Sequence, residues 1–220
     1  MAKNKIKIAV VGATGYAGCE LIKILLRHPE SEITSVSGKV DGPDKISNIY
    51  PVFRGQLELV CDNVNVQKIC GLADLVFLAL PHKVSMAFAP EFLKAGKKVI
   101  DLSADYRLKD TAVYEKWYGA KHTSPELLKT AVYGLPELYK DKIAKSGFIA
   151  NPGCYPTGAI LGIAPLLAAK AIDPAQIIID AKSGVTGAGR TPSLGLLFAE
   201  TNENFKAYKI NQHQHMPEIE

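Results

Sequence analysis

Cysteine is scarce in this sequence, and the few cysteines present lie far apart. Cys19, Cys61, Cys70 and Cys154 form no C-x-x-C pair, and no histidine cluster with finger-like spacing accompanies them. This pattern disfavours a disulfide framework and a structural zinc site, and it is typical of a protein from a reducing compartment.

Long apolar runs and a signal peptide are also lacking. No hydrophobic segment reaches the length that crosses a bilayer, and the residues before Ile6 lead directly into a strand-like segment. We therefore expect a cytoplasmic protein that does not insert into a membrane.

Charge of one sign is not concentrated anywhere. The chain has 26 Lys+Arg against 22 Asp+Glu, a net charge of +4, with no basic run. This balance argues against nucleic acid as a partner and is compatible with a small anionic substrate. With 220 residues, 47% of them hydrophobic and 22% charged, the chain is long enough for one large domain or two small ones.

Strand-like and helix-like segments alternate through the first half of the chain. Short apolar runs at residues 5–11, 32–37, 74–80 and 98–102 predict buried strands, and residues 148–150 predict one more. Helices are predicted at 19–28, where Pro29 ends the pattern, and at 84–95. This alternation predicts an α/β protein with a Rossmann-type doubly wound parallel sheet.

The second part of the chain has a different pattern. Residues 103–147 predict a long irregular excursion, and we place a domain boundary near residue 151. A helix at 157–170, a strand at 176–181 and a glycine-rich loop at 183–190 then predict the start of an α+β domain. The expected domains are a dinucleotide-binding domain, 1–150, and a substrate domain, 151–220.

Three glycines lie where the first strand meets the first helix. Gly12, Gly15 and Gly18 follow a G-x-x-G-x-x-G spacing rather than the common G-x-G-x-x-G. Glycine lets a pyrophosphate approach the backbone, and the helix N-terminus offers N–H groups and a positive dipole end. Tight packing alone is the alternative, but this strand–turn–helix setting favours dinucleotide binding.

The end of the second strand indicates which cofactor binds. NAD-specific folds usually place an acidic residue there for the ribose 2′-hydroxyl, whereas this strand ends at Ser37 and is followed by Lys39. A hydroxyl and a cation suit a 2′-phosphate, which favours NADP. Asp41 weakens that prediction, and the alternative is that Lys39 is an ordinary surface lysine.

Cys154 is the candidate nucleophile. It lies just before a predicted helix, in Asn-Pro-Gly-Cys-Tyr-Pro-Thr, where the dipole and free N–H groups stabilise a thiolate. A small buried cysteine is the alternative, and that interpretation is applied to Cys19, Cys61 and Cys70.

A thiolate nucleophile needs a proton partner, and two histidines near the end of the chain are candidates. His213 and His215 share a face if their segment is a strand. A metal site is disfavoured because no third ligand has suitable spacing, so one of the pair is expected to serve as general acid/base. His28, His82 and His122 are expected in surface or loop positions.

Seven segments in this order resemble the N-acetyl-γ-glutamyl-phosphate reductases of arginine biosynthesis, relatives of the aspartate-semialdehyde dehydrogenases. They are residues 11–18, 78–82, 100–107, 133–137, 151–157, 183–190 and 213–219. The cysteine segment and the final His-x-His-x-Pro-Glu are specific to this family, whereas the glycine turn is not.

The resemblance implies NADPH-dependent reduction of N-acetyl-γ-glutamyl phosphate to the semialdehyde, with release of phosphate. It implies that Cys154 forms a thioester, that His213 is the general acid/base and that Arg107 binds the substrate phosphate. It further implies a cofactor site that includes Thr14, Tyr16 and Pro81, and a substrate site that includes Asn151, Ser183, Gly184, Arg190, His215 and Glu218.

Members of that family are longer than 220 residues, so the resemblance implies a C-terminally truncated second domain. We expect this chain to bind nucleotide but to turn over poorly, and the family association allows a homo-oligomer. Reductases acting on aminoadipyl or aspartyl phosphate remain alternatives, as do a non-catalytic nucleotide-binding fragment and a redox role for Cys154.

Overall fold

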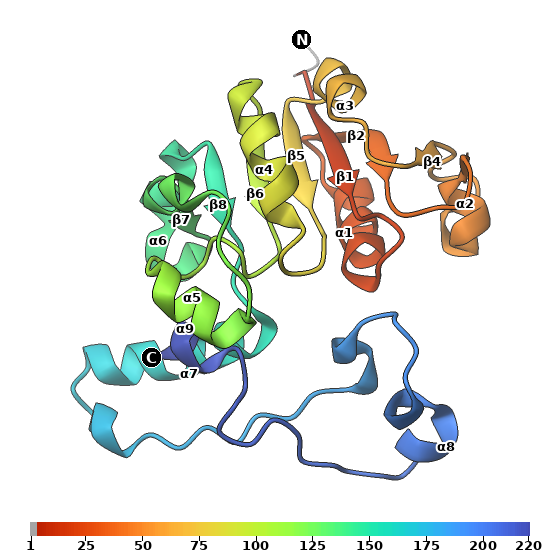
Figure 1. Ribbon diagram of the computed structural model, residues 1–220. Helices are drawn as coiled ribbons and strands as arrows, with labels where there is room; N and C mark the ends of the chain where they lie inside the picture. Colours follow the sequence, from red (N-terminus) through yellow and green to blue (C-terminus); the bar gives the residue numbers. More distant parts are fainter. Residues whose placement is uncertain (1–3) are drawn as a thin grey trace. The chain divides into compact units, whose positions relative to one another are not determined.

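The computed structural model describes residues 4–220, and its contacts divide the chain into two units. The first unit ends at Pro152, and the second comprises Gly153–Glu220. Within the described residues, every β-strand belongs to the first unit, and the second contains helices and turns (Figure 1).

An eight-stranded sheet forms the centre of the first unit, with the order β3-β4-β2-β1-β5-β6-β8-β7 (Figure 1). The strands are β1 (Ile6–Val11), β2 (Ser31–Ser37), β3 (Asp44–Lys45), β4 (Val60–Asp62), β5 (Leu75–Leu78), β6 (Lys98–Asp101), β7 (Val132–Tyr133) and β8 (Phe148–Ala150). Neighbouring strands run parallel except β3 and β4. The chain proceeds outward from β1 first to β2 and then to β5, which confirms the predicted doubly wound sheet.

Helices cover both faces of this sheet because β1 alternates its side chains between them. Ile8 and Val10 belong to the core that contains the buried residues of α1 (Tyr16–Arg27), whereas Ala9 and Val11 belong to the core with α3 (Val66–Leu72) and α4 (Ser85–Lys94). The near-continuous apolar character of β1 thus reflects burial on both faces.

The segment from residue 103 to 147 is more regular than the sequence predicted. It contains α5 (Thr111–Tyr118), a 3₁₀ helix, β7 and α6 (Pro136–Lys145). Asp110 caps α5 by accepting a hydrogen bond from the N–H of Ala112 at 2.7 Å, and Gly119 ends it with a φ of 61°. The prediction of irregular structure is wrong because these caps stabilise α5 although the hydrophobic residues of the segment follow no clear helical period.

Two predictions for the second unit are also wrong in detail. The helix α7 (Cys154–Ala168) begins three residues earlier than predicted, since Gly153 adopts the extended N-cap conformation and Pro156 is tolerated in the first turn. Residues 176–181 form no strand, and Ile178 is 94% exposed. A strand requires a hydrogen-bonded neighbour, and the described residues of this unit supply none.

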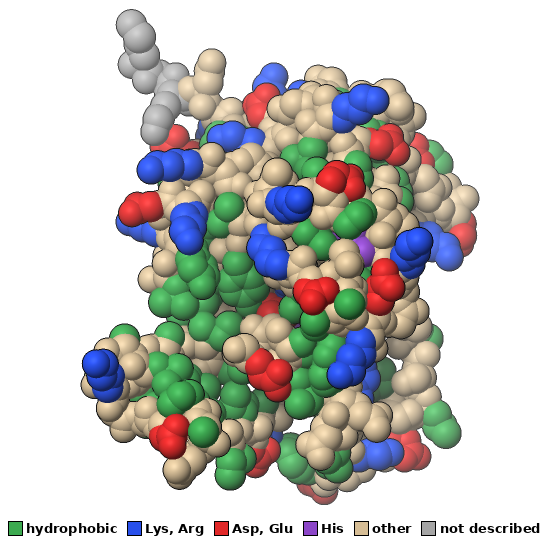
Figure 2. All heavy atoms as spheres, turned by 60° about the vertical axis from the view of Figure 1, so that its left-hand side comes forward, with side chains coloured by type: hydrophobic (Ala, Val, Ile, Leu, Met, Phe, Trp, Pro, Cys, Tyr) green, Lys and Arg blue, Asp and Glu red, His purple; other side chains and the backbone are tan. Residues whose placement is uncertain are grey.

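The described chain has no helix with both the length and the apolar character needed to cross a bilayer. Basic and acidic side chains of the described residues are interspersed on the face shown in Figure 2. On that face neither sign of charge is gathered into one patch.

Candidate active site

Two of the three glycines in the turn after β1 are required by packing. Gly12 has a φ of 92°, and a Cβ there would lie 2.2 Å from the carbonyl oxygen of Ala79. A Cβ on Gly18 would lie 2.3 Å from the carbonyl oxygen of Gly12. Both contacts are with backbone atoms, and moving these atoms would cost considerable free energy. Tight packing therefore accounts for these two glycines.

Gly15 is different, because packing does not require it to be glycine. A Cβ there would lie 3.5 Å from the Gly12 carbonyl oxygen, an ordinary van der Waals distance. Gly15 is the N-cap of α1, where it provides no side-chain cap, and the first turn of α1 carries no acidic residue. The positive end of the helix dipole is therefore not compensated by a nearby acidic side chain of that turn.

The end of β2 is hydrogen-bonded to this turn. The carbonyl oxygen of Ser37 accepts hydrogen bonds from the N–H groups of Gly12 and Ala13 at 2.7 and 2.9 Å. Ser37 itself is only 4% exposed, whereas Lys39 is exposed. Of the two residues predicted to select NADP, Lys39 is the one whose side chain lies at the surface, and both roles remain predictions.

Thr14 and Tyr16 complete the residues predicted at the turn. A Cβ on Gly38 would lie 2.7 Å from the Thr14 hydroxyl oxygen, so this glycine leaves room for the threonine. Tyr50, which sequence reasoning did not single out, donates a hydrogen bond to the carbonyl oxygen of Thr14 at 2.8 Å. Tyr16 is exposed at the start of α1.

Asp105 joins the loops that follow β5 and β6. Its Oδ1 atom accepts hydrogen bonds from the N–H of Lys83 and the hydroxyl of Tyr114, both at 2.8 Å. Lys83 has a left-handed φ of 74°, so this contact holds an unfavourable backbone conformation next to the predicted cofactor residue Pro81. Sequence reasoning missed Asp105, although it lies in a segment that carries the family resemblance.

His122 lies in the loop after α5, within its predicted surface or loop position, but it is buried there. It is 4% exposed, and its Nε2 atom is hydrogen-bonded to the carbonyl oxygen of Asp105 at 2.7 Å. The elements of residues 103–147 enclose it between the rings of Tyr106 and Tyr114. His28 and His82 are exposed, as predicted.

Arg107 connects the ends of β6 and β8. Its side chain is 8% exposed and donates from Nε to the Asn151 carbonyl oxygen at 2.7 Å and from Nη2 to the Leu102 carbonyl oxygen at 2.8 Å. The structure thus brings together Arg107 and Asn151, both predicted at the substrate site. Phosphate binding by Arg107 remains a prediction, and the observed contacts also give it a role in the fold.

Asp101 is a buried carboxyl group at the end of β6. It accepts hydrogen bonds from the hydroxyl and N–H of Ser103 at 2.7 and 3.1 Å, and burial raises its pKa to about 6. Because this folded-state pKa exceeds the ordinary value of 3.8, the group stabilises the fold most at low pH. That contribution is lost as the pH rises through about 6.

We expect the Asp101→Asn variant not to lose stability as the parent chain does when this buried carboxyl group ionises. The free energy of unfolding of the variant, relative to that of the parent, should therefore increase from pH 4 to pH 7.5, by up to about 3 kcal/mol, which corresponds to the difference between the two pKa values of Asp101. Urea unfolding at several pH values measures the difference, with the exposed Asp41→Asn as control. A difference that does not change with pH would contradict the assignment.

Cys154 is the first residue of α7 and the one exposed cysteine among the four. Cys19 and Cys61 are buried, as predicted, and burial raises the pKa of the Cys61 thiol to about 11. Cys70 is only half-buried, so its predicted burial is wrong.

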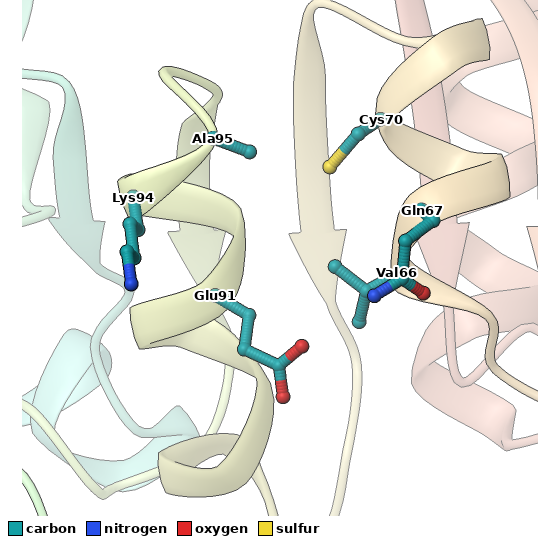
Figure 3. A pocket seen from close by; sticks show the side chains of 6 residues that line it. All are labelled: Val66, Gln67, Cys70, Glu91, Lys94 and Ala95. Carbon is teal, nitrogen blue, oxygen red and sulfur yellow. The ribbon is translucent and has the colours of Figure 1, made fainter.

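Cys70 lines a pocket of about 350 Å³, whose lining side chains come from α3 and from the C-terminal end of α4 (Figure 3). The pocket is lined by Val66, Gln67, Cys70, Glu91, Lys94 and Ala95. It contains none of the residues predicted for cofactor or substrate.

The final histidine segment packs against the start of α7 within the second unit. The ring of Tyr155 contacts the rings of His213 and His215 edge-on, at centroid distances of 5.1 and 5.8 Å. The Glu218 carboxylate accepts a hydrogen bond from the N–H of Gly153 at 2.8 Å. The segment is a turn leading into α9 (Met216–Ile219) rather than a strand, yet the two histidine rings lie together, 4.8 Å apart.

The surroundings of His213 favour its neutral form. Burial lowers the pKa of this imidazole, and the positive charge of Lys209 lowers it further. A neutral imidazole at neutral pH retains one nitrogen lone pair and one N–H donor.

The loop from Ser183 to Arg190 is exposed and has local contacts. The Ser183 hydroxyl donates a hydrogen bond to the Gly184 carbonyl oxygen at 3.0 Å, and Gly189 has a φ of 85°. The predicted substrate contacts of Ser183, Gly184 and Arg190 remain predictions.

Comparison with known sequences covers nearly the whole chain. Residues 7–146 match the family described as semialdehyde dehydrogenase, NAD binding domain, and residues 154–220 match semialdehyde dehydrogenase, dimerisation domain. The N-acetyl-gamma-glutamyl-phosphate reductase of Desulfotalea psychrophila is 53% identical over 98% of this chain, which covers 62% of that protein. The reductase of the same name from Heliobacterium modesticaldum is 50% identical over 98% of this chain, which covers 61% of that protein. The chain thus spans less than two thirds of the length of these curated relatives.

Solved structures share the fold at lower sequence identity. Aspartate semialdehyde dehydrogenase from Candida albicans, determined with NADP, aligns with a TM-score of 0.54 and 19% identity over 76% of this chain and 48% of that one. Aspartate semialdehyde dehydrogenase II from Vibrio cholerae aligns with a TM-score of 0.53 and 18% identity over 76% and 47%.

Proposed function

The chain belongs to the semialdehyde dehydrogenase family, and from this premise we propose that it carries the cofactor-binding and acyl-transfer residues of an N-acetyl-γ-glutamyl-phosphate reductase. The observation that carries the proposal is the exposed Cys154 at the first position of α7, with the His213 and His215 rings packed against the adjacent Tyr155. Relatives of this name, about half identical over almost all of the chain, support the choice of substrate.

Cys154 supplies the nucleophile in this proposal. Its thiolate attacks the acyl carbon of the acyl phosphate. The C–O bond to phosphate breaks, inorganic phosphate departs, and the acyl group remains bound to the sulfur as a thioester. The proton of the thiol passes to the histidine pair, in which the resemblance assigns His213 this task. N–H groups at the start of α7 stabilise the oxyanion of the tetrahedral intermediate.

The glycine turn fits a dinucleotide. Gly12 and Gly18 keep the turn tight, and Gly15 leaves the start of α1 open without a packing need of its own. When bound, NADPH supplies the hydride that converts the thioester to an aldehyde and frees the thiolate. Lys39 lies exposed beyond β2 and is the candidate partner for the 2′-phosphate.

The second unit is proposed to contribute to a homo-oligomer. Its match to a dimerisation domain supports this, as do large apolar side chains that it exposes. They include Leu194, Phe198, Phe205 and Ile210, each more than 70% exposed. A cytoplasmic location remains part of the proposal.

The test runs the reaction in reverse on two proteins. One is the 220-residue chain; the other, the extended chimera, continues it past Glu220 with the remaining residues of the Desulfotalea psychrophila relative. Each receives NADP⁺, phosphate and one semialdehyde, derived from N-acetylglutamate, aminoadipate or aspartate, and NADPH absorbance is followed.

We expect phosphate-dependent NADPH formation that is fastest with N-acetylglutamate semialdehyde. A faster rate with either other semialdehyde would replace the substrate assignment. NADPH binding by both proteins with no turnover by either would instead favour a non-catalytic nucleotide-binding fragment.

A further inference from the structure

We propose that Asp105 is a positioning residue for the cofactor, and that it holds the loop after β5, residues 79–84, in the conformation that binds NADPH. The inference deepens the proposed function and rests on it for the identity of the cofactor. The contacts that carry it lie within the first unit, and the conformation of the loop can be measured without any ligand.

The loop 79–84 follows the sheet edge at which a doubly wound sheet binds its ligand. The chain leaves β1 for β2 on one side and for β5 on the other, so the switch point lies between β1 and β5. Ala79 begins the loop, and its N–H donates to the Val11 carbonyl oxygen at 2.7 Å. Its carbonyl oxygen lies 2.2 Å from the position that a Cβ on Gly12 would occupy. The loop therefore lies directly beside the glycine turn.

A turn within this loop has an unfavourable backbone conformation. The N–H of Val84 donates to the Pro81 carbonyl oxygen at 3.2 Å, which closes a β-turn with Lys83 as its third residue. Lys83 has a φ of 74°, in the left-handed region where glycine is favoured and a side chain with a Cβ is disfavoured. The intrinsic preference of lysine does not select this conformation, so contacts from the rest of the fold must stabilise it.

Asp105 supplies such a contact from the loop after β6. It is 0% exposed, and its Oδ1 atom accepts a hydrogen bond from the Lys83 N–H at 2.8 Å. Its Oδ2 atom accepts a longer one, 3.4 Å, from the N–H of Met86 in the first turn of α4. The N-cap residue Val84 gives this helix no side-chain hydrogen bond, and the first turn has no acidic residue. The carboxylate of Asp105 therefore caps α4 and lies at the positive end of its dipole.

Two further contacts fix the carboxylate relative to the loop that it holds. The hydroxyl of Tyr114 in α5 donates to Oδ1 of Asp105 at 2.8 Å. The N–H of Ala104, the residue before Asp105, donates to Nδ1 of His82 at 2.9 Å. His82 is the residue before Lys83, so two successive residues of one loop are hydrogen-bonded to two successive residues of the other. Such support from neighbouring groups is what keeps a functional loop in one geometry.

The contacts of Arg107, in the same loop as Asp105, involve other atoms. The Arg107 side chain donates to the carbonyl oxygens of Asn151 and Leu102, at 2.7 and 2.8 Å. Removing the Asp105 carboxylate leaves both of these acceptors in the chain. The inference therefore predicts an effect on NADPH binding that phosphate binding does not share.

Fluorescence titration of the 220-residue chain with NADPH tests the inference first. In Asp105→Ala, Lys83 loses the contact that holds its φ, so the left-handed conformation becomes a minor one and affinity should fall by about tenfold. Adding Lys83→Gly to Asp105→Ala should restore affinity to within about threefold of the parent, because glycine adopts a positive φ about as readily as a negative one.

Tyr114→Phe is the matched control, because it removes a hydrogen bond from the same carboxylate and keeps the Lys83 contact. Its NADPH affinity should equal that of the parent, although its free energy of unfolding should decrease. If Asp105→Ala does not fold, Asp105→Asn takes its place. Its single acceptor oxygen then serves three donors, and the loss of affinity should be smaller but in the same direction. Parent-like affinity in the Asp105 variant that folds, or no recovery with Lys83→Gly, would overturn the inference.

Amide hydrogen exchange without ligand tests the loop directly. Mass spectrometry of a peptide that covers residues 79–86 should show faster exchange in Asp105→Ala than in the parent, because the Lys83 N–H has lost its acceptor. Tyr114→Phe should leave this exchange unchanged. Equal protection in Asp105→Ala and the parent would show that Asp105 does not hold the loop. A parent chain that does not bind NADPH would reject the cofactor role, and exchange would still decide whether Asp105 holds the loop.

Turnover separates a positioning role from general damage, in whichever of the 220-residue chain and the extended chimera is active. Asp105→Ala should raise KM for NADP⁺ by about tenfold and leave KM for phosphate unchanged. An equal rise in both KM values would indicate damage throughout the first unit and would reject the positioning role. Absence of turnover in both parent proteins would reject the proposed function, whereas titration and exchange would still decide the role of Asp105.

Discussion

Replacing Cys154 with alanine is expected to reduce phosphate-dependent turnover by roughly three orders of magnitude or more, the scale on which enzymes lose activity when their nucleophile is removed. The reason is chemical, since no other exposed thiol lies at a helix N-terminus in the described chain. Reverse-reaction rates of the parent and the variant, measured in the active form of the protein, give the factor.

NADPH affinity should be unchanged in the same variant. The glycine turn belongs to the first unit and Cys154 to the second, so the substitution leaves the residues of the turn intact. Fluorescence titration with NADPH measures this. Cys70→Ala is the matched control, because this half-buried thiol lines a pocket that contains no predicted site residue.

Retained turnover in Cys154→Ala would leave the thiol as a redox group without acyl chemistry. Loss of both turnover and NADPH binding would point instead to a damaged fold. A covalent adduct on Cys154, detected by mass spectrometry after mixing with acyl phosphate and no NADPH, would support the thioester step independently.

The central sheet could be predicted from the sequence because its strands are long or strongly apolar. β1, β5 and β6 lie within predicted runs, since burial on both faces leaves a near-continuous apolar signal, and β2 begins one residue before its predicted run. β3 and β7 have two residues each and β4 has three, too few to show a period, whereas β8, with three residues, was predicted because all three are apolar. They form because neighbouring strands offer hydrogen-bonding partners.

Site residues were predictable from the sequence where the residue type and its local motif by themselves indicate a chemical role. Cys154 and the histidine pair stood out by residue type and motif. The contacts of Asp105, Tyr50 and Tyr208 did not, because each depends on a partner brought close by the fold. The Tyr155–Tyr208 hydrogen bond, for example, joins residues 53 positions apart. The spacing of residues in the sequence does not indicate such a contact.

The glycine turn provides a second large and separable effect. Gly12→Ala should destabilise the fold by about 4 kcal/mol or more, because its Cβ would lie 2.2 Å from a backbone oxygen at a φ of 92°. A loss of that size removes a large part of the stability of a typical domain. Urea unfolding measures the loss, and failure to accumulate as a folded protein is its extreme form.

Gly15→Ala in the same turn should leave stability nearly unchanged but weaken NADPH binding. Its Cβ would make a 3.5 Å contact, so the free energy of unfolding should change by less than about 1 kcal/mol, the scale of an altered N-cap. The added methyl group would nevertheless stand at the open start of α1, where the proposed pyrophosphate approaches the backbone. NADPH affinity should therefore fall by about tenfold or more. If Gly15→Ala bound NADPH as tightly as the parent, the turn would serve packing alone, and the cofactor would have to bind elsewhere on the first unit.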